Sequence, residues 1–287
     1  MTPKNHQYDP ILAPYDHIRT RTIALIEHDN ARIDVLDIAG IGLFGSICSG
    51  WLVSWGVLDA NARVLELACG SGFYTYSLLE WGARSVLGVD VSTVMMDKAR
   101  SVGEEKGVAE RVAFIEADCT VPKVYDGGEF DVVFGAWLLN YASDREGLVG
   151  MFRNVAMNLK DGGRFVSITL PPASNPIDSI NAEARARPEP EGSGLLVYKH
   201  IKDVEDGVFF GVHAETPVGE LYFDCYHLRK EVYEEAAREA GLKGKLEWGV
   251  TEVPERFLTE NPPGGATLHE VETYKSVPAH GVLVITK

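Results

Sequence analysis

The chain has 287 residues, of which 42 are acidic and 27 are basic, so its formal net charge is −15. This length predicts one large α/β domain with an insertion. The negative charge argues against a nucleic-acid substrate and against docking on an anionic membrane. The four cysteines form no CxxC pair, which indicates reduced thiols in a cytoplasmic protein. No HxH or His/Asp triad spacing with a third ligand occurs, so we predict no catalytic metal.

Residues 38–58 carry no charge and are long enough to span a bilayer. Five glycines and three serines dilute their hydrophobicity, and Trp51 and Trp55 lie one helical turn apart, as packing residues would. We therefore expect a buried layer or an interface helix here, in preference to a membrane span or a flexible lid. An interface helix would fit a homodimer.

From Arg63 onward, apolar strand patterns alternate with helical ones, which predicts a parallel sheet covered by helices on both faces. Apolar residues recur at helical spacing in 144–159. The expected strands are 63–67, 85–90, 111–116, 130–135 and 163–170, and the expected helices are 73–82, 93–107 and 144–159.

Two consecutive prolines, Pro171 and Pro172, end this alternation. We expect short antiparallel strands in 171–228, then a helix at 229–240 with Gly241 as its C-cap, and strands near 245–250 and 281–286. The predicted fold is a Rossmann-like, doubly wound, mostly parallel seven-stranded α/β sheet with a small antiparallel β insertion. Its parts are a core at 63–170, a substrate-side insertion at 171–228 and a C-terminal completion of the sheet at 229–287.

The stretch 64–72, Val-Leu-Glu-Leu-Ala-Cys-Gly-Ser-Gly, predicts a strand that passes through a glycine loop into a helix. Such a loop presents backbone N–H groups and a positive dipole end to a ligand. The second strand ends at Asp90, where nucleotide-binding βαβ units place an acid for ribose hydroxyls. A dinucleotide loop would read GxGxxG, but Thr75 occupies the third glycine position, which argues against a nicotinamide oxidoreductase.

Five motifs follow one another in the chain: ELACGSG (66–72), GVDVS (88–92), EADC (116–119), FDVVFGAW (130–137) and LKDGGRF (159–165). In this order they resemble the motifs of the class I S-adenosylmethionine-dependent methyltransferases. The resemblance covers 63–170 and looks closest to small-molecule methyltransferases of the toxoflavin-synthase and ubiquinone-methyltransferase type. It implies S-adenosylmethionine as cofactor, S-adenosylhomocysteine as product, and methyl transfer to an O or N atom of a small molecule of secondary or cofactor metabolism. The alternative is a protein of this fold that catalyses a cyclisation or rearrangement, or only binds ligand.

The resemblance assigns the first group of cofactor contacts to the glycine loop and the second strand. Ala68, Gly70 and Gly72 would let the backbone approach the cofactor, with Ala68 replacing the glycine that the family uses first. Glu66 would orient the loop and the cationic amino group, or else bond only to nearby amides. Asp90 would accept hydrogen bonds from both ribose hydroxyls, or else cap the strand end.

The resemblance places the second group of contacts after the next strands. Val91 would lie against the adenine. Asp118 would accept from the adenine amino group, or else cap a turn, and Cys119 would donate from its backbone. Ala136 and Trp137 follow the fourth strand, where the sulfonium end should lie.

Candidates for acceptor binding and catalysis lie in the insertion and in 1–62, which looks like the family's N-terminal helical lid. Tyr15 would pack over the cofactor, or else anchor the surface. Tyr141 would line the methyl-transfer channel, with core packing as the alternative. His213 and His227 are the candidate general bases, and a structural histidine is the alternative for each.

Overall fold

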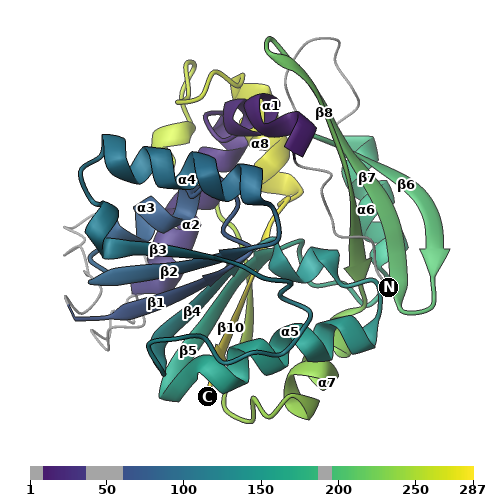
Figure 1. The fold of residues 1–287 in the computed structure, drawn as a ribbon. Helices are drawn as coiled ribbons and strands as arrows, with labels where there is room; N and C mark the ends of the chain where they lie inside the picture. The colour runs from purple at the N-terminus through teal and green to yellow at the C-terminus, as the bar shows by residue number, and fades with distance from the viewer. Residues whose placement is uncertain (1–8, 37–60, 187–195) are drawn as a thin grey trace.

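The computed structural model describes residues 9–36, 61–186 and 196–287 (Figure 1). Seven of the described strands form one sheet in the order β3-β2-β1-β4-β5-β10-β9. β1 to β5 are parallel, and β10 runs antiparallel to both of its neighbours. The strands are β1 Arg63–Leu67, β2 Ser85–Asp90, β3 Val112–Glu116, β4 Phe130–Ala136, β5 Leu159–Thr169, β9 Leu246–Val250 and β10 Gly281–Thr286. The predicted doubly wound fold is confirmed.

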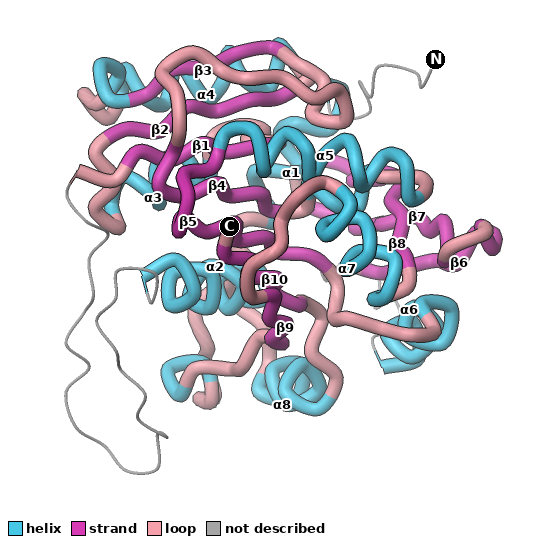
Figure 2. The backbone as a smooth tube through the Cα atoms, turned by 90° about the horizontal axis from the view of Figure 1, so that it is seen from below, coloured by secondary structure: helices cyan, strands magenta, loops and turns pink. Residues whose placement is uncertain are grey.

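Helices cover both faces of this sheet, which explains why the central strands are apolar runs. α5 (Arg145–Asn158) and α7 (Lys230–Glu239) pack on one face, and α2 (Thr22–Leu36) and α3 (Phe73–Glu80) pack on the other (Figure 2). α4 (Thr93–Glu105) contacts β2 and β3 at the far edge.

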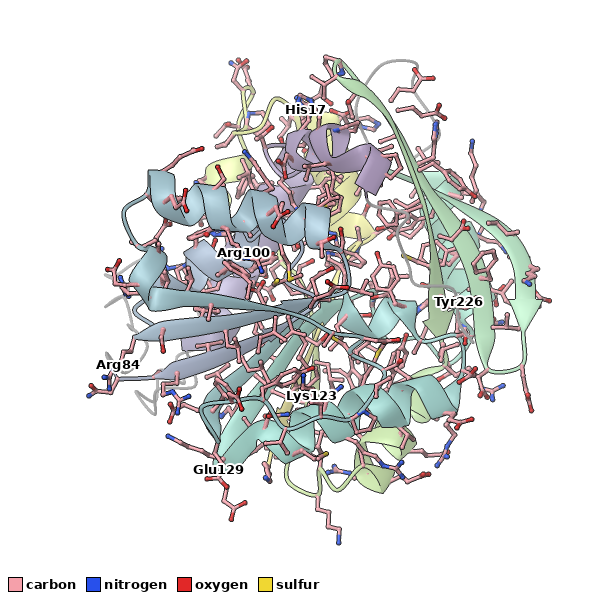
Figure 3. The ribbon with its side chains drawn as sticks, in the orientation of Figure 1. His17, Arg84, Arg100, Lys123, Glu129 and Tyr226 are labelled. Atoms are coloured by element: carbon pink, nitrogen blue, oxygen red, sulfur yellow. The ribbon has the colours of Figure 1, made fainter. Side chains whose placement is uncertain are left out.

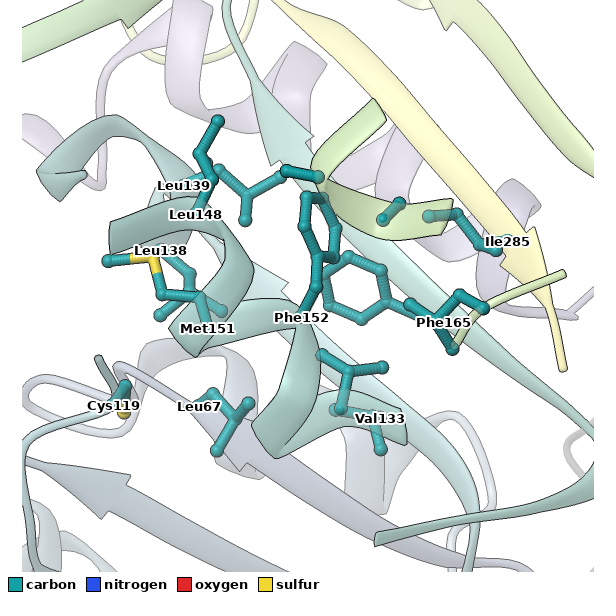
Figure 4. Close-up of a cluster of buried hydrophobic side chains, with 14 of the residues drawn as sticks. Leu67, Cys119, Val133, Leu138, Leu139, Leu148, Met151, Phe152, Phe165 and Ile285 are labelled. Atoms are coloured by element: carbon teal, nitrogen blue, oxygen red, sulfur yellow. The ribbon is translucent and has the colours of Figure 1, made fainter. Parts of the chain in front are cut away.

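The core between α5 and the sheet is built from large apolar side chains (Figure 4). Phe152 of α5 meets Phe165 of β5 edge to face, with ring centroids 6.0 Å apart. Leu67 and Val133, from β1 and β4, are fully buried beside them. This packing fixes the strands whose carboxyl ends carry the candidate site.

The fifth predicted strand begins earlier than expected. Leu159 belongs to β5 and not to the preceding helix, and the register with β4 shifts between Phe130 and Val132. Gly162, with φ 76°, lies in the bulged stretch between the two paired parts of β5.

The insertion contains the predicted antiparallel strands, β6 (Val197–Val204), β7 (Gly207–Thr216) and β8 (Gly219–Leu228), in one three-stranded sheet. It also contains a helix that the sequence reasoning missed, α6 (Pro176–Ala186), which contacts β6 and β7. A second missed helix, α8 (Leu268–Ser276), precedes β10. Gly241 has φ 99° directly after α7, as expected of a C-cap.

The N-terminal helices α1 (Leu12–Ile18) and α2 bridge the insertion and the core. α1 contacts β7 and β8, whereas α2 contacts β5 and β10. The expectation for 38–58 lies outside the described residues. Within the described part of the chain, no helix is both long and apolar enough to cross a membrane.

Candidate active site

The glycine loop follows β1 at the carboxyl edge of the sheet, which faces the insertion. Arg84 and Glu129, which precede β2 and β4, mark the opposite edge, and Tyr226 lies on the insertion sheet (Figure 3). Open α/β sheets bind ligands at the carboxyl edge of their strands. The predicted loop is therefore on the side where a ligand is expected.

Three residues of the loop have left-handed backbone angles: Ala68 (φ 61°), Gly70 (φ 52°) and Gly72 (φ 86°). A Cβ on Gly72 would lie 2.9 Å from the Tyr76 ring, so close packing of α3 requires this glycine. A Cβ on Gly70 would meet no atom within 4 Å. Gly70 therefore borders open space where a cofactor could approach the backbone.

Asp90 ties the end of β2 to this loop. Its carboxylate accepts from the Gly70 amide at 2.8 Å and from the Ser92 amide at 2.9 Å. A carboxylate has about four acceptor positions. Asp90 thus holds the glycine loop at the position where the resemblance places the acceptor of the ribose hydroxyls, and the ribose contact stays a prediction.

Glu66 is 2% exposed and accepts a hydrogen bond of 2.5 Å from the Thr75 hydroxyl. Burial, with a smaller contribution from the Asp90 charge, raises the pKa of Glu66 to about 8, although the Thr75 hydrogen bond opposes this. A nearby cation would favour the carboxylate form. The predicted contact with a cationic amino group is therefore compatible with this environment.

The other predicted adenine-side residues follow β2 and β3. Val91 is partly exposed. Asp118 is exposed and caps a turn through one oxygen, which accepts from the Thr120 amide at 2.9 Å and the Thr120 hydroxyl at 2.7 Å. Burial raises the pKa of the Cys119 thiol to about 12, so it is a packing group and not a nucleophile. The adenine contacts of these residues stay predictions.

Trp137 directly follows Ala136, the last residue of β4, and has φ 63°, which is uncommon for a residue with a bulky side chain. Its Nε1 donates to Glu27 at 3.2 Å, and its ring lies edge to face with His280 at 5.3 Å between centroids. Such backbone strain persists where surrounding contacts fix it, and it clusters at functional sites. Trp137 is thus held in place at the position predicted to border the methyl donor.

A buried network around Glu27 of α2 was missed by sequence reasoning. Glu27 is 3% exposed, and its carboxylate accepts from Arg19 at 2.9 Å and from the Tyr74 hydroxyl at 2.7 Å, besides Trp137. His280 lies 3.3 Å from the same carboxylate. Although burial opposes it, Arg19 and His280 hold the pKa of Glu27 below its usual value. This carboxylate joins the N-terminal helices to the core.

The network continues away from Glu27 through His280. The Nδ1 atom of His280 bonds to the Tyr274 hydroxyl at 2.7 Å, and that hydroxyl bonds to Thr251 at 2.7 Å. No motif marks these residues, because they come together only when α2, α8 and β10 pack.

A cavity of about 60 Å³ lies between the N-terminal helices, the insertion sheet and Trp137. Tyr15 and Tyr141, both predicted site residues, line it together with Trp137. Tyr15 accepts from Arg19 at 2.6 Å. Burial raises the pKa of Tyr141 well above its usual value, so its phenol stays neutral. The cavity therefore combines three predicted residues with the Glu27 network.

The two predicted histidine bases do not line this cavity. His213 of β7 bonds to Glu220 at 2.9 Å and lies on the face opposite to Val212, a cavity residue. His227 is 1% exposed, and burial lowers its pKa to about 4. Their positions give no support to the predicted base role, whereas His280, which was not predicted, reaches the cavity. Across the described residues, no group of three potential ligands could hold a metal ion.

Comparison with known proteins agrees with this geometry. Residues 64–163 match the model of a methyltransferase domain. The chain is 31% identical over 151 residues to a ubiquinone biosynthesis O-methyltransferase from Xanthomonas axonopodis pv. citri, covering 50% of this chain and 56% of that protein. It is also 31% identical over 160 residues to an mRNA cap guanine-N(7) methyltransferase from Caenorhabditis elegans, covering 51% of this chain and 41% of that protein.

A solved structure of a putative S-adenosylmethionine-dependent methyltransferase from Listeria monocytogenes shares the fold. Its TM-score is 0.54 at 18% identity, and the match covers 91% of this chain and 98% of that one. The chain thus carries a class I methyltransferase domain. This domain indicates an enzyme that uses S-adenosylmethionine as its cofactor. The chain spans about half the length of the curated relatives it matches.

Proposed function

We propose that the protein transfers the methyl group of S-adenosylmethionine to an O or N atom of a small molecule bound in the cavity beside Trp137. The observation that carries this proposal is the position of the cavity. It adjoins the end of β4 at the carboxyl edge of the sheet, and its wall includes Tyr15, Tyr141 and Trp137. The predicted cofactor residues lie along the same edge.

The cofactor supplies a methyl group made electrophilic by a sulfonium. Asp90 and the glycine loop would hold it, and the N-terminal helices would exclude water from the acceptor. Ser71 of the loop donates to Asp16 of α1 at 2.8 Å, which fastens these helices over the loop. Orientation and removal of water can supply much of the rate enhancement of such a displacement.

Charge and cavity size favour a small acceptor over RNA or a protein. One relative is named for the mRNA cap and another for ubiquinone biosynthesis. This chain carries a net charge of −15, which repels a phosphate backbone. A cavity of about 60 Å³ enclosed by helices leaves no room for a nucleic acid or a folded protein.

The test begins with native mass spectrometry for retained cofactor, followed by a labelled-methyl screen of phenols, amines and heterocycles. We expect label in at least one acceptor, with release of S-adenosylhomocysteine. Val212→Phe, which narrows the cavity, should abolish transfer without changing cofactor affinity. His213→Gln changes the adjacent residue on the opposite face of the strand and should leave methyl transfer intact. Cofactor binding without transfer to any acceptor would contradict the proposal and favour a non-methylating reaction.

A further inference from the structure

The cavity wall contains charged side chains, and their charges do not balance. Arg19, Arg21, Glu27 and His280 all line the cavity. Glu27 is bound to Arg19 at 2.9 Å and to His280 at 3.3 Å. Among the described residues, the Arg21 side chain makes no hydrogen bond or ion pair. Arg21 is therefore an uncompensated cation in the wall of the acceptor cavity.

The Nε atom of Arg21 is buried and lacks an acceptor within the described chain. A buried donor without a partner costs about 1–3 kcal/mol, and more when the group is charged. The chain has 42 acidic residues that could have compensated it, yet none of those described does so. This arrangement is the one expected if a ligand supplies the anion.

The rest of the cavity is apolar and largely aromatic. Besides Tyr15 and Trp137, its wall includes Tyr141, Tyr198 and Phe223. Such walls accommodate a flat ring by stacking and edge contacts. The cavity thus offers an aromatic enclosure with one uncompensated guanidinium in its wall.

We infer that the methyl acceptor is a small aromatic carboxylic acid whose carboxylate pairs with Arg21. This inference rests on the proposed function, because it treats the cavity as the acceptor site. A planar carboxylate matches the fork of a guanidinium with two parallel hydrogen bonds. A phosphate dianion would need a second free cation, and Glu27 already neutralises Arg19.

The cavity also limits the acceptor to a small size. Its volume of about 60 Å³ is below the roughly 150 Å³ of a cavity that holds benzene. A one-ring acid therefore enters only if the wall formed by α1 and α2 moves outward. Gly265 lies beside Arg21, since a Cβ there would be 3.4 Å from the guanidinium, so this loop would move with it.

The experiment measures binding of 4-hydroxybenzoate and its neutral match 4-hydroxybenzamide to the full chain by calorimetry, in the presence of S-adenosylhomocysteine. A second pair consists of 4-aminobenzoate and its neutral match 4-aminobenzamide. In the wild type we expect each acid to bind at least tenfold more tightly than its amide. Arg21→Gln should reduce this ratio to about twofold, and Arg21→Lys should retain part of it.

The matched control is Arg256→Gln, which removes a cation that is bound to Asp29 of α2 and lies outside the cavity wall. It should leave the acid preference unchanged. Equal binding of acid and amide, absence of binding by every acid, or an unchanged ratio in Arg21→Gln would each overturn the inference. Arg21-dependent acid binding without methyl transfer would instead refute the proposed function alone.

Discussion

Replacing Glu27 by glutamine should loosen the N-terminal helices from the core. The carboxylate is 3% exposed and faces two cationic or potentially cationic groups, Arg19 and His280, besides the Tyr74 and Trp137 donors. Glutamine keeps the volume but leaves the buried Arg19 guanidinium without a counter-charge. Removing one partner of a buried ion pair costs about 3–5 kcal/mol.

We therefore expect Glu27→Gln to lower the free energy of unfolding in urea by about 3 kcal/mol. A matched double variant, Glu27→Gln with Arg19→Met, should recover part of this loss, because an apolar side chain needs no counter-charge. A loss below about 1 kcal/mol, or no recovery in the double variant, would refute the view that this ion pair fastens the helices to the core.

Three further predictions concern the loop and two buried titratable groups. Gly70→Ala should weaken cofactor binding in calorimetry with a stability loss of only about 1 kcal/mol from its positive φ, whereas Gly72→Ala should lose more stability because its Cβ would lie 2.9 Å from Tyr76. The pKa of Glu66 is about 8 in the folded chain and 4.5 in the unfolded chain, so between these pH values the folded state holds a proton that the unfolded state has lost. The free energy of unfolding of the apo protein should therefore fall as the pH rises through this range. Glu66→Gln should remove that slope in urea titrations. Burial lowers the pKa of His227 from 6.5 to about 4, so the free energy of unfolding should fall as the pH drops from 6.5 to 4. The same dependence of this free energy on pH in His227→Phe would contradict this.

The sequence indicated the core sheet well because its strands are short apolar runs buried on both faces. The two missed helices carried local signals of another kind. Thr267 and Glu270 form a capping box at the start of α8, and Pro176 opens α6. Hydrophobic periodicity does not predict them, because each helix is short and shows the pattern over only a few turns.

The cofactor side of the site was accessible from sequence because its residues lie within one ordered set of motifs. The acceptor side was not. Glu27, Arg21 and His280 become neighbours only through the packing of α2 against β10 and the loop before it. Strand alternation separates His213 from Val212, but it cannot tell which face will cover a cavity. Tertiary contacts alone decide that.

The central claim is that S-adenosylmethionine binds at the carboxyl edge of β1 and β2. The most direct measurement is calorimetric titration of the cofactor into the wild type, Asp90→Ala and Asp131→Ala. Asp131 is a matched control, because it also accepts a backbone amide, that of Arg63 at 2.8 Å, but lies near the opposite edge. We expect cofactor binding to be lost in Asp90→Ala and kept in Asp131→Ala. Wild-type affinity in Asp90→Ala would contradict it.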